Sequence, residues 1–228
     1  MTGVAILKPV EDKTLRAQVA QQILSMVTGG HFLPGQRLTE ISLSTQLQVS
    51  RAPLREAIRE LVDGGILISE PYKGLRVRPV SVQDLEELYS MRTALEQFAF
   101  RLAWNKRSEA ALQDLGDRYD RLIEVQTSGD QAKTVDCELA FHSWVYELSG
   151  HALLQSQWQR LLPLVQIYMS LHFKTHGSHG QFKHMTTEYL ELARGTSLDA
   201  IQDHIVEHMQ QGLASVKSTD LIDGSGGG

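Results

Sequence analysis

The sequence predicts a mainly α-helical protein with two parts. The first part is three helices followed by a β-hairpin, and the second is an antiparallel bundle of about six helices. Two patterns predict this fold class. Apolar residues recur every three or four positions along most of the chain, and apolar and polar residues alternate only around residues 66–78. The length of 228 residues is enough for one small and one medium domain, each with its own core.

The first predicted helix ends near residue 28. Four apolar residues repeat at helical spacing along one face: Leu15, Val19, Ile23 and Val27. Gly29 and Gly30 then end the helix, and Pro34 with Gly35 turns the chain.

Residues 38–62 predict two short helices joined by a tight turn at residues 48–49. Three leucines give the first of them an inward face: Leu38, Leu43 and Leu47. Ser50 is expected to cap the second helix, because its hydroxyl can accept a hydrogen bond from a backbone amide that would otherwise be unpaired. The second helix therefore begins at Arg51.

Arginines form a row along this second helix. Arg51, Arg55 and Arg59 repeat every four residues, on the ridge beside an inward-facing row. The inward row is apolar: Leu54, Ile58, Leu61 and Val62. Guanidinium groups in such a row can contact DNA phosphates and the edges of guanine bases. The alternative is an amphipathic surface helix whose arginines are only solvated.

A β-hairpin follows the arginine row. Ile66 and Ile68 alternate with their neighbours, and residues 72–74 form the tip. Four residues of the return strand alternate in polarity: Leu75, Arg76, Val77 and Arg78. The order of helix, helix, arginine-bearing helix and hairpin predicts a winged helix-turn-helix domain that binds DNA.

Charge is unevenly distributed along the chain, although the formal net charge is −5. Residues 1–80 carry 10 Lys and Arg against 7 Asp and Glu, whereas the remainder carries 12 against 20. A basic first part is what phosphate binding requires, and the acidic remainder would repel DNA. No apolar run is long enough to cross a bilayer and no signal peptide opens the chain, so we expect a cytoplasmic protein that does not bind membranes. Cys137 is the single cysteine, which excludes an internal disulfide.

Residues 81–216 predict helices only. Ser81 is a candidate N-cap, and an inward-facing seam follows it in steps of three and four. The seam consists of Leu85, Leu88, Arg92, Leu95, Ala99 and Leu102, so an arginine lies in an apolar row. Breaks divide the rest into helices at Ser108 and at residues 128–129, 149–150, 177–180 and 195–197. No glycine-rich phosphate loop or Ser/His/Asp signature occurs, so we do not expect an enzyme.

Carboxylate and imidazole side chains share core-facing stripes of the predicted bundle. Glu138 and His142 lie one helical turn apart, His184 opens the next-to-last helix, and His204 and His208 lie on one stripe of the last. Three imidazoles and one carboxylate from three helices would suit Zn²⁺, or Ni²⁺ or Mn²⁺ with positions open for a ligand. The alternative is that these are ordinary hydrogen-bonded side chains, since the chain has nine histidines.

Two sets of motifs resemble a known family. The runs PGQRLTE, QVSRAPLREAIREL and GGILISEPYKGLRVRPVS are similar to the winged-helix domain of GntR-family bacterial transcriptional regulators. The runs ELAFHSWVYELSGHALL, HMTTEYLELARG and AIQDHIVEH are similar to the FCD ligand-sensing domain in the FadR branch of that family.

The resemblance implies roles for individual residues. The DNA-contacting residues that we predict from the arginine row and the wing lie in the part that resembles the winged-helix domain: Ser50, Arg51, Arg55, Arg59, Gly74 and Arg76. The metal ligands would be Glu138, His142, His184 and His204. The run MRTALEQFAFRLA resembles the family's Arg-x-x-x-Glu pattern, which implies that Arg92 faces the cavity and meets a carboxylate of the effector.

The chain departs from the family pattern at three positions. Glu138 stands where the family commonly has Asp, His151 replaces the Asn of a Gly-Asn pair, and Ile41 stands where the family often has a base-contacting Arg. The longer arm of Glu138 affects metal choice, and Ile41 implies a different operator sequence. We expect residues 172–179, which include three histidines, to form a mobile polar loop.

The sequence therefore predicts a homodimeric transcriptional regulator. A DNA-binding domain over residues 1–80 would bind a palindromic double-stranded operator, because one recognition helix covers only a half-site. An FCD-like domain over residues 81–218 would sense a small organic acid through a divalent metal ion, and residues 219–228 would be a flexible tail. Two alternatives remain open: a metal-dependent enzyme fused to a DNA-binding domain, and a regulator that responds to the metal itself. The sequence does not decide whether operator binding represses or activates.

Overall fold

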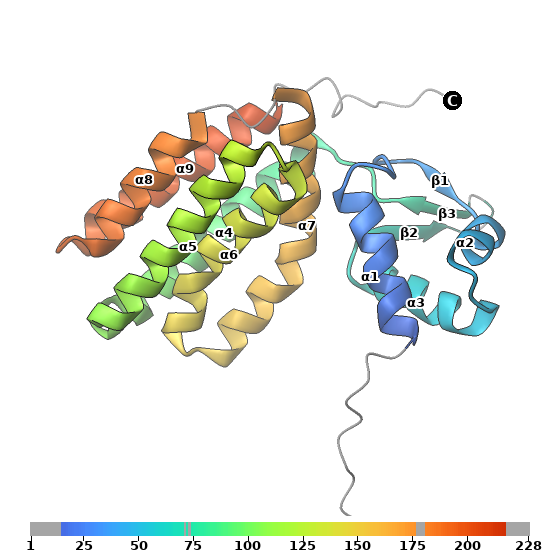
Figure 1. Cartoon of the computed structure of the whole chain (residues 1–228), viewed down its shortest axis with the longest axis horizontal. Helices are drawn as coiled ribbons and strands as arrows, with labels where there is room; N and C mark the ends of the chain where they lie inside the picture. The colour runs from blue at the N-terminus through green and yellow to red at the C-terminus, as the bar shows by residue number, and fades with distance from the viewer. Residues whose placement is uncertain (1–14, 71, 73, 177–180, 218–228) are drawn as a thin grey trace, which may run out of the picture.

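The computed structural model describes residues 15–70, 72, 74–176 and 181–217, and it has the two predicted parts (Figure 1). The first part consists of helices and a small antiparallel sheet. Its elements are α1 (Leu15–Thr28), β1 (Arg37–Leu38), α2 (Glu40–Leu47), α3 (Arg51–Asp63), β2 (Leu67–Glu70) and β3 (Gly74–Val77). The predicted winged helix-turn-helix architecture is confirmed.

The sheet contains a strand that we did not predict. Its order is β1-β3-β2, and Leu38 of β1 lies opposite Leu75 of β3. Leu38 therefore lies in a strand, and its predicted place on the inward face of a helix is wrong. The helix α2 begins only at Glu40, because the Thr39 hydroxyl accepts a hydrogen bond from the Ser42 amide and so caps the helix there.

The hairpin begins one residue later than expected. Ile66 and Leu67 are both buried, so the simple alternation predicted for this strand fails at its start, and β2 begins at Leu67. The return strand agrees with the prediction, since Leu75 and Val77 are buried and Arg76 is more exposed. The sheet therefore packs one apolar face against the helices of this part.

The turn between α2 and α3 forms at the predicted residues. Gln48 adopts the left-handed conformation, with φ 52°, and ends α2, while α3 begins at Arg51. Ser50 is the N-cap residue, but its side chain accepts no capping hydrogen bond in the described structure, so that expectation is wrong. Ser50 is exposed, and water can satisfy the first amides of α3 in place of the hydroxyl.

The second part is the predicted bundle, with six α-helices among the described residues. They are α4 (Val82–Ala103), α5 (Glu109–Ser128), α6 (Gln131–Ser149), α7 (Ala152–His176), α8 (Gln181–Arg194) and α9 (Leu198–Lys217), with a short 3₁₀ helix η1 (Trp104–Lys106) after α4. Ser81 caps α4 in a capping box with Asp84, and Ser108 caps α5. Gly129 and Gly150 end α5 and α6 in the left-handed conformation that favours glycine.

The helix α7 is longer than we predicted. It continues through Pro163 to His176, so residues 172–176 are helical, and a loop over residues 172–179 is wrong for this stretch. The helix continues because Val165 and Tyr168 are buried and hold its next turns against the bundle. Residues 177–180 lie outside the described residues.

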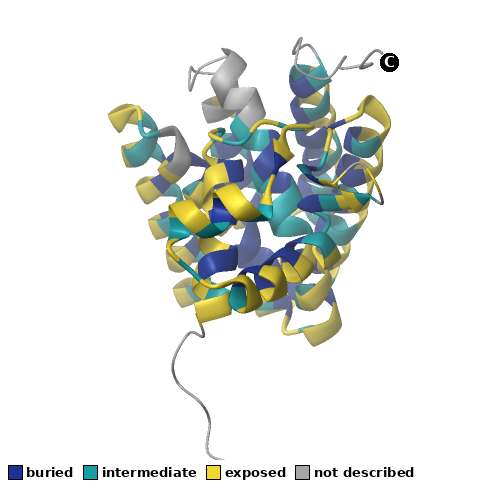
Figure 2. Ribbon diagram, turned by 90° about the vertical axis from the view of Figure 1, so that its right-hand side faces the viewer, coloured by how far each residue is buried: buried dark blue, intermediate teal, exposed yellow. Residues whose placement is uncertain are grey.

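The helix α4 occupies a central position in the bundle and packs against α6, α7 and α9. Figure 2 shows buried residues on the inner sides of the helices and exposed residues on their outer sides. The two parts of the molecule also touch, because α7 packs against α1. An ion pair of 2.7 Å between Arg78 and Asp84 joins the end of the wing to the first turn of α4.

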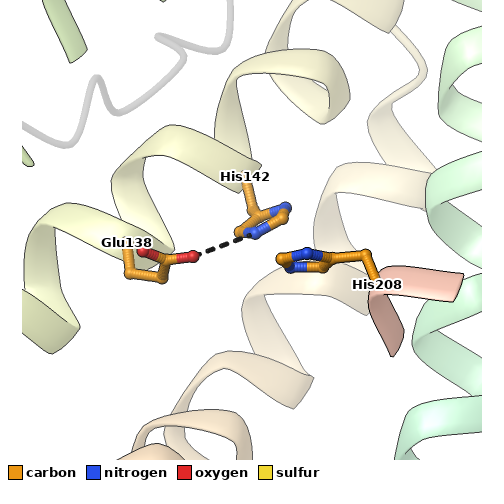
Figure 3. A group of neighbouring side chains, drawn as sticks. All are labelled: Glu138, His142 and His208. Atoms are coloured by element: carbon orange, nitrogen blue, oxygen red, sulfur yellow. Dashed lines mark ion pairs between the residues drawn. The ribbon is translucent and has the colours of Figure 1, made fainter. Parts of the chain in front are cut away.

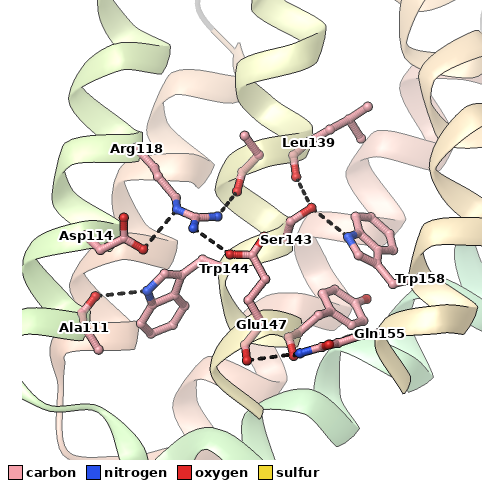
Figure 4. A network of polar contacts seen from close by, with 11 residues as sticks. Ala111, Asp114, Arg118, Leu139, Ser143, Trp144, Glu147, Gln155 and Trp158 are labelled. Carbon is pink, nitrogen blue, oxygen red and sulfur yellow. Dashed lines mark hydrogen bonds and ion pairs between the residues drawn. The ribbon is translucent and has the colours of Figure 1, made fainter. Parts of the chain in front are cut away.

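Polar contacts on both sides of α6 fix the rotation of this helix about its own axis (Figure 4). On one side, Arg118 of α5 forms ion pairs with Asp114 at 3.1 Å and with Glu147 of α6 at 2.6 Å. On the other side, the Ser143 hydroxyl accepts a hydrogen bond of 2.7 Å from the indole N–H of Trp158 on α7. Anchoring from both neighbours determines which residues of α6 point into the bundle.

Candidate DNA-contacting surface and buried metal site

The arginine row of α3 lies on the surface of the first part. Arg51, Arg55 and Arg59 are exposed, whereas Leu54 on the neighbouring ridge is fully buried. Nε of Arg55 donates a hydrogen bond of 2.9 Å to a carboxylate oxygen of Glu40 on α2. An exposed ion pair of this kind contributes little free energy, so Arg55 can exchange it for a phosphate or a base.

Gly74 and Arg76, the other predicted contacts, lie on β3 in the wing. Gly74 has a φ of 82°, a backbone conformation that side chains rarely tolerate, so glycine is required by the turn itself. Arg76 is half-buried and lies opposite Arg37 in the sheet. The wing therefore places two arginines side by side at its surface.

Three buried side chains converge inside the bundle (Figure 3). Glu138 and His142 come from α6 and His208 comes from α9, and one ligand atom of each lies within 4.8 Å of the others. The three residues are 3%, 0% and 7% exposed. A carboxylate and two imidazoles shielded from water are a donor set that suits a divalent transition metal, so the residues present fit such an ion.

His142 is oriented by a second carboxylate, Glu96 of α4. Nδ1 of His142 lies 2.7 Å from Oε1 of Glu96, and the same oxygen accepts the Tyr189 hydroxyl at 2.8 Å. Burial would raise the pKa of Glu96, but the adjacent His142 and Arg92 and the Tyr189 hydroxyl hold it below its ordinary value. Because this carboxylate can only accept, Nδ1 carries the proton and Nε2 is left to face Glu138.

Nε2 of His142 lies 3.4 Å from Oε1 of Glu138. If the imidazole is neutral, both atoms present lone pairs, so a cation is needed between them, either a proton on Nε2 or a metal ion. Burial would lower the pKa of His142, yet the negative charge of Glu96 and the proximity of Glu138 raise it. Within the described residues, Nε2 of His142 and Oε2 of Glu138 have no hydrogen-bond partner.

His208 contributes a neutral imidazole to the group. Burial lowers the pKa of His208 well below its ordinary value, and the nearby positive charges of His142 and Arg92 act in the same direction. Its Nδ1 has no partner in the part of the chain that the structure describes. A neutral imidazole with a free nitrogen is the form that binds metal.

Two histidines of the predicted ligand set lie outside this group. His204 is buried, but its Nε2 donates a hydrogen bond of 2.9 Å to the backbone carbonyl of Met185. The His184 side chain is 83% exposed, and its Nδ1 lies 3.9 Å from a carboxylate oxygen of Glu188. The structure thus brings together two of the four predicted ligands and adds His208, which we did not include among them.

Arg92 faces the interior and is only 4% exposed. Its Nε lies 3.6 Å from Oε2 of Glu96, which is too far for a hydrogen bond, and its guanidinium carbon lies 5.6 Å from the centre of the Trp158 ring. Among the described residues, Nε and Nη2 of Arg92 and the Tyr146 hydroxyl have no hydrogen-bond partner. Burial raises the pKa of Tyr146 well above its ordinary value, so this hydroxyl stays a donor. Unpaired buried donors are costly.

Four residues that shape this site were not predicted as site residues: Glu96, Tyr146, Trp158 and Tyr189. Glu96 has a local signal, because it follows Arg92 by one helical turn in the quoted Arg-x-x-x-Glu pattern. The aromatic residues have none, since aromatic side chains at helical spacing are typical of any core.

Comparison with known families agrees with the two parts. Residues 15–77 match the family described as bacterial regulatory proteins of the gntR family, and residues 87–211, more than half of the chain, match the FCD domain. The chain belongs to the GntR family and carries the FCD domain of its FadR subfamily. The exposed arginine row therefore belongs to a DNA-binding domain, and the buried polar group lies within the FCD domain.

Several relatives regulate bacterial operons. The chain is 29% identical over 195 residues to the Nta operon transcriptional regulator of Aminobacter aminovorans, which is 84% of this chain and 91% of that protein. It is 32% identical over 157 residues to the "Probable D-xylose utilization operon transcriptional repressor" of Paenarthrobacter nicotinovorans, which is 69% of each chain. These relatives are DNA-binding transcriptional regulators and not enzymes, and we assign this chain to the same class.

Solved structures share the fold. The Escherichia coli regulator McbR superposes with a TM-score of 0.76 at 22% identity, covering 90% of this chain and 98% of that one. A transcriptional regulator GntR from Rhodococcus gives 0.75 at 22% identity with the same coverage. Among the helices that the structure describes, we find none that is both long and apolar enough to span a membrane.

Proposed function

We propose that this regulator binds a palindromic operator as a homodimer and changes its operator affinity when a small carboxylate binds inside the FCD domain. In the DNA-binding domain, Arg51, Arg55 and Arg59 of α3 would read bases and phosphates, and Arg76 of the wing would bind phosphate. One α3 covers only a half-site, so a second copy would supply the other half.

The carboxylate would bind between Arg92 and a divalent metal ion. Glu138, His142 and His208 would hold the ion, and three protein ligands leave a position open for the effector. When bound, the ion supplies positive charge that attracts a carboxylate oxygen. The observation that carries this proposal is the set of unpaired buried polar atoms, with acceptors on Glu138 and His142 and donors on Arg92 and Tyr146.

The charges of the site favour an anionic ligand only when the ion is present. If the histidines are neutral, the positive charges are those of the Arg92 guanidinium and the divalent ion, and the negative charges are the carboxylates of Glu96 and Glu138. The site with its ion then has one net positive charge. A single carboxylate neutralises it, and a buried net charge is costly. Without the ion, a proton on His142 already makes the set neutral. We therefore expect effector affinity to depend on metal.

The names of relatives suggest where a search for the effector should begin. The Gluconate operon transcriptional repressor of Bacillus subtilis is 24% identical over 155 residues, which is 68% of this chain and 63% of that protein. Together with the relative named for D-xylose utilization, it favours a panel that starts with sugar acids and other hydroxy acids. These acids carry one carboxylate for Arg92 and hydroxyls for the neighbouring acceptors.

The helix α4 would carry the effector signal to DNA. Arg92 and Glu96 lie on α4, which begins directly after the wing, and the Arg78–Asp84 ion pair ties its first turn to the wing. A movement of Arg92 toward a bound anion would therefore displace the wing and α3 and change the separation of the two recognition helices. Coupling energies between two such sites are typically about 1–3 kcal/mol.

Metal retention tests the ligand set. The wild type and His184→Ala, whose residue is exposed, should retain about one divalent ion per chain, whereas His142→Ala and His208→Ala should lose it. Elemental analysis after desalting measures retention, and circular dichroism verifies that the helices persist. Full retention in the His142→Ala/His208→Ala double variant would show that other residues hold the ion.

Calorimetry on Arg92→Ala tests the effector site, with a carboxylate found by thermal-shift screening. Loss of a charge-assisted contact should reduce effector affinity by about 1.5–3 kcal/mol, while metal content and effector-free operator binding stay near wild type. Arg121→Ala on α5 is the matched control, since Arg121 is exposed. Normal effector binding by Arg92→Ala, or unchanged operator affinity of the saturated wild type, would reject the mechanism. Operator release by metal alone would instead identify the metal as the signal.

A further inference from the structure

Two histidines that do not join the buried group share a carboxylate of their own. Nδ1 of His204 on α9 lies 3.6 Å from Oε2 of Glu188 on α8, and Nδ1 of His184 lies 3.9 Å from the same oxygen. His184 and Glu188 are one helical turn apart, so both lie on one side of α8. The helices α8 and α9 pack side by side, which brings His204 to this pair (Figure 1). We call His184, Glu188 and His204 the outer group.

A hydrogen bond of His204 determines which of its nitrogens faces the carboxylate. Nε2 lies 2.9 Å from the backbone carbonyl oxygen of Met185, which can only accept, so Nε2 carries a proton. Nδ1 of the neutral ring therefore presents a lone pair. This atom is buried and has no hydrogen-bond partner within the described residues. A backbone carbonyl that orients the ring in this way is a usual partner of a metal-binding imidazole.

Two acceptors thus face each other in the outer group. The lone pair on Nδ1 of His204 and the carboxylate oxygen of Glu188 repel each other at 3.6 Å unless a cation lies between them. A shared proton would form a hydrogen bond, and 3.6 Å is too long for one. Two ligand atoms at about 2.0–2.1 Å from one tetrahedral zinc ion are about 3.4 Å apart. The spacing therefore suits a metal ion better than a proton.

The outer group extends from the interior of the bundle to solvent. The side chain of His204 is 2% exposed, that of Glu188 is 44% exposed and that of His184 is 83% exposed. Because His184 is exposed, it can rotate toward a bound ion, and water can fill the remaining coordination positions. Two imidazoles and one carboxylate favour Zn²⁺, Ni²⁺ or Co²⁺ over Mg²⁺ and Ca²⁺, which prefer oxygen ligands.

We infer that the outer group is a second site for a divalent transition metal, which captures ions from solution before they reach the buried group of Glu138, His142 and His208. The centre of the His204 ring lies 6.0 Å from that of His208, and the centre of the His208 ring lies 5.1 Å from that of His142. Neighbouring imidazoles therefore connect the two groups. The capturing role rests on the proposed metal in the buried group, whereas the outer site itself does not.

The outer site should hold its ion more weakly than the buried site. Water reaches two of its three ligands, so the ion should exchange with solution and be removed by desalting, while the buried ion is retained. The negative charge of Glu188 near the surface attracts cations, which should raise the rate at which ions enter.

Equilibrium dialysis of the metal-free full chain against Zn²⁺, with Mg²⁺ in excess, tests the outer site. The wild type should bind about two ions per chain and retain about one after desalting. Glu188→Gln and His184→Ala should weaken binding of the second ion about tenfold or more and leave the retained ion in place. Glu191→Gln and His31→Ala, at exposed positions, are the matched controls and should bind zinc as the wild type does. Circular dichroism verifies that all variants keep their helices.

Three results of this experiment would overturn the outer site. The first is a wild type that binds no second ion, and the second is a second ion that neither Glu188→Gln nor His184→Ala weakens. The third is displacement of the second ion by Mg²⁺, which would mean that unspecific attraction to acidic side chains holds it.

The rate of zinc uptake tests the capturing role. Metal-free protein is mixed with Zn²⁺, samples are quenched with a chelator at intervals and desalted, and elemental analysis measures the retained ion. Glu188→Gln and His184→Ala should fill the buried group about tenfold more slowly than the wild type and reach the same final occupancy. Equal rates in the wild type and both variants would overturn the capturing role.

Failure of the outer site is distinguishable from failure of the buried one. A wild type that retains no ion after desalting, but binds one ion at equilibrium that Glu188→Gln weakens, would reject the buried site and leave the outer site standing. One tightly retained ion without a second would reject the outer site and leave the buried one.

Discussion

The surface of α3 and the buried group of the FCD domain use charge in opposite ways. Arg51, Arg55 and Arg59 are exposed, so water solvates them when no DNA is bound. Arg92 and Glu96 are buried, and several polar atoms around them lack partners in the described structure. The exposed charges of α3 therefore cost the fold little free energy, whereas the bundle holds its charges out of water. Substitutions should separate DNA affinity from stability at α3 but change ligand binding and stability together in the bundle.

The largest effect on stability should come from Glu96. Glu96→Ala would leave Nδ1 of His142 and the Tyr189 hydroxyl unpaired and remove the carboxylate beside Arg92. We expect the free energy of unfolding to fall by about 3–5 kcal/mol, measured by urea denaturation. Glu124→Ala on α5, at an exposed position, should change it by less than about 0.5 kcal/mol. Equal losses in the two variants would mean that Glu96 does not organise the site.

Substitutions on α3 should act on DNA affinity alone. Arg51→Ala or Arg55→Ala should weaken specific operator binding by about 1–3 kcal/mol if a base contact is lost, with the melting temperature unchanged. Arg76→Ala should weaken binding to all DNA sequences by a similar factor. It should also reduce the salt dependence of DNA affinity by about one phosphate contact. Salt titrations of operator and random DNA distinguish the two behaviours. Wild-type affinity in both α3 variants would remove the docking mode proposed for α3.

A smaller, pH-dependent effect is expected where the two domains join. Burial would raise the pKa of Asp84, but hydrogen bonds from Ser81 and Arg78 hold it below its ordinary value. The carboxylate therefore stabilises the fold above its unfolded pKa of about 3.9, and this contribution disappears as the pH falls through the lower folded pKa. The ion pair is partly exposed, with side-chain exposures of 37% for Arg78 and 25% for Asp84, so the contribution should be less than about 1 kcal/mol.

Thermal melts of Asp84→Asn test this expectation. The variant should melt below the wild type at neutral pH, and the difference should disappear in acid, where the wild-type carboxylate is protonated as well. A difference that stays constant from neutral pH into acid would mean that the ion pair with Arg78 does not contribute.

The bundle could be predicted because its boundaries are local. Ser81 and Ser108 cap helices, and Gly129 and Gly150 end them, each through contacts with residues nearby in the sequence. Leu38 shows the limit of such reasoning. Its partner in the sheet, Leu75, is far away in the sequence, so the pattern of one helix could not exclude a strand there.

The buried Glu138, His142 and His208 group was harder to predict, for two reasons. The buried face of α8 contains Met185, Tyr189 and Ala193 at steps of four, and His184 precedes this row by one residue, which turns it toward solvent. That signal was present in the sequence. The choice between His204 and His208 was not present in the sequence, because both are buried on α9 and only the packing of α9 within the bundle decides which one lies near Glu138.

Trp158 gives the bundle an optical property. Its indole is 1% exposed, is stacked on Tyr146 with 2° between the ring planes, and lies beneath the guanidinium of Arg92. The emission of an indole depends on the electric field around it, so an anion that displaces Arg92 should shift the fluorescence of Trp158. Quenchers dissolved in water cannot reach a ring this deeply buried. Trp158 should therefore act as an intrinsic fluorescent reporter of whether the site is filled.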